Sequence, residues 1–169
     1  KPTLAVLRER AIPFANPWRR KAGHWNPLQA SNGVSTASRL FAFLEALEQN
    51  RPWTLTELQS WIHPLRVKDL LLEGAKDALE RYAETIEAGG EPTDTPLDLC
   101  FPRDLSLEWP DLATAAQWWF SHLLAAYDKA ARFPVRIVTK RSLAAIQEPP
   151  RVFIGTIHSV KGGEADTVA

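Results

Sequence analysis

Two short β-type segments lie near opposite ends of a sequence whose middle is patterned almost entirely for helices. The first is the extended piece at 12–14, where Pro13 disfavours helical geometry in the residue before it. The second is the β-branched and aromatic run at 152–157, which follows a double proline and is typical of a strand buried on both faces. Because a lone strand cannot bury its own faces, the pattern predicts a sheet interrupted by a helical insertion.

Apolar periodicity and capping residues predict the helices of this middle part. Ser35 is a suitable N-cap for a helix whose apolar stripe includes Leu40 and Leu44. Thr54 and Glu57 have the spacing of a capping box, which opens a short helix that ends near Pro64. The remaining predicted helices span residues 3–10, 67–88 and 110–132.

For two segments the sequence pattern allows more than one structure. Residues 91–109 read as a loop that is long for a compact domain, so it is functional, mobile or contains a short helix. Residues 133–148 mix a proline suited to the first turn of a helix with several β-branched residues. The helical spacing of Val135 and Val138 favours a short helix through Ala145.

Composition narrows the classes of function. The 20 basic and 20 acidic residues cancel, so any contact with nucleic acid depends on local patches. The single cysteine excludes an internal disulfide and suits a reducing cytosol, which predicts a cytoplasmic protein. No apolar run approaches the roughly 20 residues that a bilayer span requires, so no membrane is expected. The four histidines lack paired spacing, so no metal site is expected.

Polar chemistry begins where the second β-type run ends. Thr156, His158, Lys161 and Glu164 follow in a segment that also carries two adjacent glycines. Loops at the carboxyl edge of a sheet are where α/β proteins place ligand-binding groups. The segment is not a Walker P-loop, because Lys161 precedes its glycines instead of following them.

The segment Thr156-Ile-His-Ser-Val-Lys-Gly-Gly-Glu164 resembles motif V of the UvrD/Rep-like superfamily 1 helicases, T-x-H-x-x-K-G-x-E. It departs from better-known members at Gly163, where they carry Leu, and at Ala165, where they carry an aromatic residue. A weaker likeness is Ala11-Ile-Pro-Phe14, similar to the family's G-I-P-[FY] strand with Ala in place of Gly.

The resemblance implies roles for particular residues. Glu164 and Gly162 would contact bound ATP, while Thr156, His158 and Lys161 would lie near DNA or phosphate. A basic cluster between Trp18 and Trp25 has the composition of a nucleic-acid contact, whereas its ordinary interpretation, which we favour, is a solvated connector between domains. Its members are Arg19, Arg20 and Lys21.

The implied architecture is mainly α: a helical subdomain inserted in a RecA-like α/β (P-loop NTPase) domain of which only edge pieces are present. Residues 1–28 would be the end of motor domain 2 and a connector, 29–148 the helical 2B-like subdomain, and 149–169 the return into motor domain 2. The missing initial methionine and the end at Ala169, inside a continuing α/β unit, are expected of a fragment.

The implied function is that of an ATP-dependent DNA helicase of the kind used in DNA repair, moving 3′ to 5′ on single-stranded DNA. The intact protein would bind ATP and Mg²⁺, contact single-stranded and duplex DNA, and meet protein partners through the helical subdomain. The chain itself carries no P-loop and no Asp-Glu magnesium pair, so alone it should bind neither cofactor and be inactive. The alternative is a stand-alone helical module that binds protein or DNA without enzymatic activity.

Overall fold

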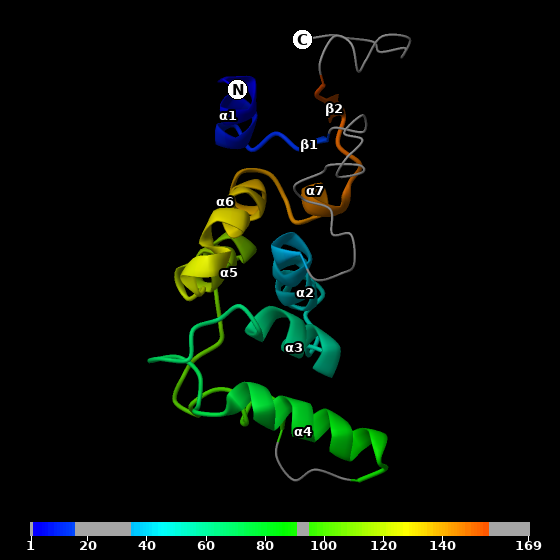
Figure 1. The fold of residues 1–169 in the computed structure, drawn as a ribbon, viewed down its shortest axis with the longest axis vertical. Coiled ribbons are helices and arrows are strands. Elements are labelled where there is room, and N and C mark those ends of the chain that lie inside the picture. Colours follow the sequence, from blue (N-terminus) through cyan, green and yellow to red (C-terminus); the bar gives the residue numbers. More distant parts are fainter. Residues whose placement is uncertain (1, 16–34, 91–94, 156–169) are drawn as a thin grey trace.

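The computed structural model describes residues 2–15, 35–90 and 95–155, and this part of the chain is mainly helical (Figure 1). Within these ranges no helix is both long enough and apolar enough to cross a bilayer. The elements are α1 (Pro2–Glu9), β1 (Phe14–Ala15), α2 (Thr36–Glu48), α3 (Leu55–Ile62), α4 (Ala75–Glu87), α5 (Leu112–Ser121), α6 (Ala125–Lys140), α7 (Ala144–Gln147) and β2 (Val152–Phe153).

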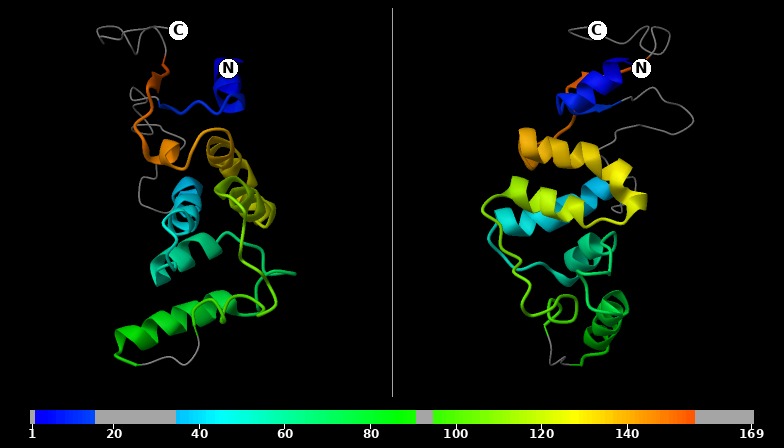
Figure 2. Two further views of the ribbon diagram at one scale, coloured as in Figure 1. Left: turned by 180° about the vertical axis from the view of Figure 1, so that it is seen from behind. Right: turned by 90° about the vertical axis from the view of Figure 1, so that its left-hand side faces the viewer.

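The chain runs from one end of an elongated molecule to the other and back again (Figures 1 and 2). The first helix and both strands lie together at one end, and α4 lies at the other (Figures 1 and 2). Between them, α2 packs against α3, α5 and α6. The described segments nearest the two ends of the sequence are therefore neighbours, as β1 and β2 pair with each other.

Side-chain caps begin three of the helices, and two of these caps are at the residues that the sequence predicts. Ser35 Oγ accepts the Ser38 amide at 3.1 Å and starts α2. The capping box of α3 is complete, with Thr54 and Glu57 each accepting the other's amide. Asp111 accepts the Thr114 amide at 2.6 Å, and this bond holds the pKa of the Asp111 carboxyl below its usual value. Each cap satisfies an amide that the first helical turn leaves free.

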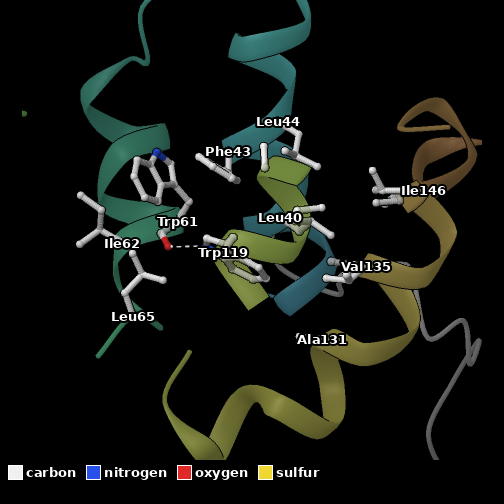
Figure 3. Packing of buried hydrophobic residues seen from close by; sticks show 14 of the residues in the cluster. Leu40, Phe43, Leu44, Trp61, Ile62, Leu65, Trp119, Ala131, Val135 and Ile146 are labelled. Carbon is white, nitrogen blue, oxygen red and sulfur yellow. Dashed lines mark hydrogen bonds between the residues drawn. The ribbon is translucent and has the colours of Figure 1, made fainter. Parts of the chain in front are cut away.

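The core is centred where α2, α3, α5 and α6 meet (Figure 3). Two large indoles, Trp61 and Trp119, are fully buried there. Trp119 Nε1 donates to the Trp61 carbonyl at 3.0 Å, so the polar atom of one ring meets a carbonyl in the last turn of α3. The apolar stripe predicted for α2 is confirmed, since Leu40, Phe43 and Leu44 have no exposed surface.

The helix predicted over 67–88 begins eight residues later than expected. Asp69 and Gly74 have φ of 59° and 72°, a left-handed conformation that no α-helix accommodates. Residues 67–74 form turns instead, and α4 starts at Ala75. Its predicted end is confirmed, because Gly89 takes the positive φ of 79° that closes helices.

The helix predicted over 110–132 is two helices with a break at 122–124. At the break the backbone pairs with the segment after α3, through Arg66 N to His122 O and Leu124 N to Pro64 O, both at 2.9 Å. These non-local hydrogen bonds replace the helical ones, and apolar periodicity gives no sign of them. The prediction of one continuous helix was therefore wrong.

The ambiguous segment at 133–148 is helical, as the spacing of Val135 and Val138 favours. Its first part continues α6 through Lys140, so Pro134 lies inside a helix and not in a first turn. A separate short helix, α7, follows. The described part of the 91–109 loop, residues 95–109, contains no helix, and it buries Cys100 and Phe101 in the core.

The terminal strand is less buried than the sequence predicts. Within the described residues β2 comprises Val152 and Phe153, and Phe153 is 56% exposed. The described sheet consists of two strands, so part of its surface stays open to solvent. Burial on both faces, which requires layers on either side of a sheet, is therefore not found for this strand.

Candidate nucleic-acid interface

The two strands define one sheet edge at which both β segments end. They run parallel, with Phe14 opposite Val152 and Ala15 opposite Phe153. One further hydrogen bond, from Ile154 N to Ala15 O at 2.9 Å, extends the pairing beyond β2. Parallel strands place their carboxyl ends at the same edge, which is where α/β proteins locate ligand sites.

Every site residue predicted from the sequence lies outside the described residues. Arg19, Arg20 and Lys21 follow β1 in the chain, and Thr156, His158, Lys161, Gly162 and Glu164 follow β2. Their roles in contacting DNA and ATP stay predictions. The structure does describe the two strands that precede them, and these strands are paired side by side.

The turn before β1 holds a residue in a strained conformation. Ala11 has φ of 52°. The Ile12 amide bonds to the Leu7 carbonyl at 2.8 Å and the Ala11 amide to the Arg8 carbonyl at 3.3 Å, which together form a Schellman motif. Such motifs favour glycine at the left-handed position, because a Cβ atom is crowded there.

Basic side chains from the last turns of α6 and from the residue after it connect this turn to the helical block. Arg136 Nη1 donates to the Arg8 carbonyl and Lys140 Nζ to the Glu9 carbonyl, each at 3.3 Å. Arg141 Nε donates to the Ala11 carbonyl. These carbonyls belong to the end of α1 and its turn, where positive charge is favourable because of the helix dipole.

Two of these basic residues, Arg136 and Lys140, border a pocket that the sequence reasoning missed. This pocket, the α5–α6 pocket, has a volume of about 390 Å³. It is lined by Gln117, Phe120, Arg132, Val135, Arg136, Thr139 and Lys140. The available signal was the recurrence of cations at 132, 136 and 140, which share one face of a helix once α6 is known to continue past Pro134.

The tryptophans of the described residues serve the core. Trp61 and Trp119 are buried, while Trp53, Trp109 and Trp118 are partly buried and packed against Phe43. None of these five therefore presents a fully open face to a nucleobase. Trp18 and Trp25 lie outside the described residues.

A second group of titratable side chains joins α3 to its neighbours. Tyr127 Oη lies 3.2 Å from His63 Nδ1, and Lys76 Nζ donates to the His63 and Leu65 carbonyls. Burial, followed by the charges of Arg39 and Lys76, lowers the pKa of His63. Burial also lowers the pKa of Lys76, with a further contribution from Arg39. The bonds of Lys76 go to backbone carbonyls, so this group ties elements together.

The described residues contain neither a cluster suited to a metal ion nor a reactive thiol. In 2–15, 35–90 and 95–155, no three His, Cys, Asp or Glu side chains are grouped to hold a metal ion. His122 Nδ1 lies 2.7 Å from the Trp118 carbonyl, so this ring contacts the backbone at the end of α5. Burial raises the pKa of the Cys100 thiol to about 12, so it stays protonated and unreactive near neutral pH.

A scan against protein-family models, a search of curated proteins and a search of solved structures each find no match to this chain.

Proposed function

We propose that this chain is the helical insertion of a UvrD/Rep-like superfamily 1 DNA helicase, together with the flanking edges of its second motor domain. The intact protein would couple ATP hydrolysis, with Mg²⁺, to movement along single-stranded DNA. The observation that carries the proposal is the parallel pairing of β1 with β2. Consecutive strands of a sheet usually lie side by side, so a helical insertion between two strands of a parallel sheet is expected to leave a neighbouring parallel pair of this kind.

The exposure of the strand pair supports the same proposal. Parallel sheets occur with several strands and with both faces covered, whereas this pair has two short strands and a largely exposed Phe153. Such a pair is expected to be stable when it belongs to a larger sheet. The proposed RecA-like domain would supply the additional strands.

The conformation of Ala11 gives a further argument. In the resembling helicases the strand sequence is G-I-P-[FY], and Ala11 occupies the position of the glycine. Its φ of 52° is one that glycine adopts without strain. The backbone here is thus suited to the residue type of that pattern, although the residue itself departs from it.

The proposal is tested in the intact protein with steady-state ATPase assays, with and without single-stranded DNA. We expect Glu164→Ala to lower kcat/KM for ATP about tenfold, since it removes one charge-assisted hydrogen bond. Lys161→Ala should leave basal hydrolysis unchanged and abolish its stimulation by DNA. Glu148→Ala and Lys129→Ala, which replace exposed residues of the same types, are the matched controls.

Wild-type values for both variants would contradict the site assignment. The gene itself offers an independent check, because the proposal requires a P-loop upstream of this segment and an arginine-bearing motif downstream of Ala169. A gene that encodes no motor around this segment would favour the stand-alone helical module.

A further inference from the structure

The exposed side of α6 carries three cations in a row beside the α5–α6 pocket. Arg132, Arg136 and Lys140 recur every four residues, so their backbone positions are about 6 Å apart along the helix axis. All three side chains are exposed, with Arg132 at 67%. This row is separate from the segments that resemble helicase motifs.

The charge of this row is largely uncompensated. No acidic residue is among the described residues that line the pocket. Asp128 pairs with Arg132, whose Nη2 lies 2.5 Å from the carboxylate. Arg136 and Lys140 donate to carbonyls of α1, which are neutral and leave the charge of both cations in place. The pocket therefore has a net positive lining.

The other lining residues complement a ligand that carries both phosphates and bases. Phe120 is partly buried and contributes an aromatic ring to the pocket. Gln117 is exposed and offers an amide that both donates and accepts hydrogen bonds. An aromatic ring beside a row of cations is the usual composition of a surface that binds single-stranded nucleic acid.

We propose that the α5–α6 pocket and the cation row of α6 bind single-stranded nucleic acid, with consecutive phosphates along Arg132, Arg136 and Lys140 and a base against Phe120. Regular spacing of the cations favours a phosphodiester backbone, whose charges repeat at a fixed interval, over an acidic peptide. This contact is additional to the proposed helicase motif and does not depend on ATP.

The test is fluorescence anisotropy of labelled oligonucleotides with the full chain, in salt from about 50 to 200 mM. The probes are a 20-residue oligo-dT and an abasic phosphodiester of the same length. The variant Arg132→Gln/Arg136→Gln/Lys140→Gln removes the cations, and glutamine still offers a donor to the α1 carbonyls. The matched control, Arg66→Gln/Arg81→Gln/Arg103→Gln, removes three exposed cations elsewhere.

We expect the α6 variant to lower the salt slope by about 2, close to 0.7 for each lost phosphate contact. Its affinity for oligo-dT should fall about tenfold or more, while the control stays within about twofold of the wild type. Repeating both in an Arg19→Gln/Arg20→Gln/Lys21→Gln background separates this site from the basic cluster after β1. In that background the α6 variant should still bind oligo-dT more weakly than its control.

Two single variants keep the test independent of the bonds to α1. Arg132→Gln alone, which touches none of the α1 carbonyls, should lower the slope by about 0.7. Asp128→Asn removes the acidic partner of Arg132 and should strengthen binding several-fold. Circular dichroism and thermal melting identify any variant that has lost its fold.

Equal loss of affinity in the α6 variant and its control would overturn the proposal, as would Asp128→Asn leaving binding unchanged. Equal affinity for the abasic probe and oligo-dT, or equal competition by polyglutamate, would identify a general polyanion surface and overturn it as well. These outcomes are separate from the helicase proposal, since the ATPase of Glu164→Ala and Lys161→Ala involves none of these residues.

Discussion

Trp119 donates its indole hydrogen to the carbonyl of Trp61 at 3.0 Å, across 58 positions of sequence. Trp61 lies in the last turn of α3, where helical carbonyls have no partner within their own helix. The bond therefore gives a carbonyl in the last turn of α3 a partner and joins α5 to α3 at the same point. Both rings are fully buried, so no water is available to replace the donor.

We expect Trp119→Phe to lower the free energy of unfolding by about 2 to 4 kcal/mol. It leaves a buried carbonyl without a partner and removes part of a large core side chain. Trp118→Phe is the control, because Trp118 is partly exposed and its indole nitrogen makes no hydrogen bond to the described residues. Urea unfolding measures both, and an equal loss in the two variants would show that the bond contributes little.

The stability contributed by Glu57 should depend on pH. Hydrogen bonds from Arg51, at 2.6 and 2.8 Å, together with the contacts of Thr54, lower the pKa of Glu57 to about 2 against the opposing effect of burial. A depressed pKa means that the ionised carboxylate stabilises the fold above the unfolded pKa, near 4.5. That contribution is lost as the pH falls from about 4.5 to about 2.

Glu57→Gln should therefore cost about 1 to 2 kcal/mol at pH 7, a value reduced for solvent screening of a partly exposed pair. The difference from the wild type should shrink steadily below pH 4.5. Glu45→Gln is the matched control, as Glu45 lies 3.7 Å from the same arginine and is 32% exposed. It should cost no more than about 0.5 kcal/mol at any pH. A pH-independent difference for Glu57→Gln would contradict the assignment.

The helix expected from the sequence and the observed structure predict opposite effects of Gly74→Ala on the free energy of unfolding. In the continuous helix expected over 67–88, Gly74→Ala would stabilise the protein by about 1 kcal/mol. In the observed structure Gly74 has φ of 72° and precedes the first residue of α4, so the alanine is strained and costs about 1 kcal/mol. Thermal or urea unfolding decides between them. Glu73→Ala, at an exposed neighbouring position, is the control for introducing an alanine into this turn.

The parts of the fold that were predicted correctly depend on neighbours in sequence. The caps at Ser35 and Thr54, and the apolar stripe of α2, are relationships between residues within about one or two helical turns. The errors occur where distant segments decide the backbone. The break at 122–124 is stabilised by pairing with the segment after α3, and the apolar periodicity of the sequence cannot predict a pairing between such distant segments.

The candidate site divides in the same way. The row of cations on α6 was visible in principle at 132, 136 and 140, yet the expected helix boundary at Arg132 separated its members. Its relation to the α1 carbonyls could not be predicted, since Arg136 and Arg8 lie 128 positions apart. The residues assigned to ATP and DNA from the helicase resemblance depend on recognition of a motif, and their geometry lies outside the described residues.

The side-by-side pairing of β1 with β2 has a consequence for the helices between them. The two strands are neighbours, about 5 Å apart as in any paired strands, so the chain leaves and returns at one end of the molecule. A change in the number or length of the helices between the strands therefore does not require the strand pair to move.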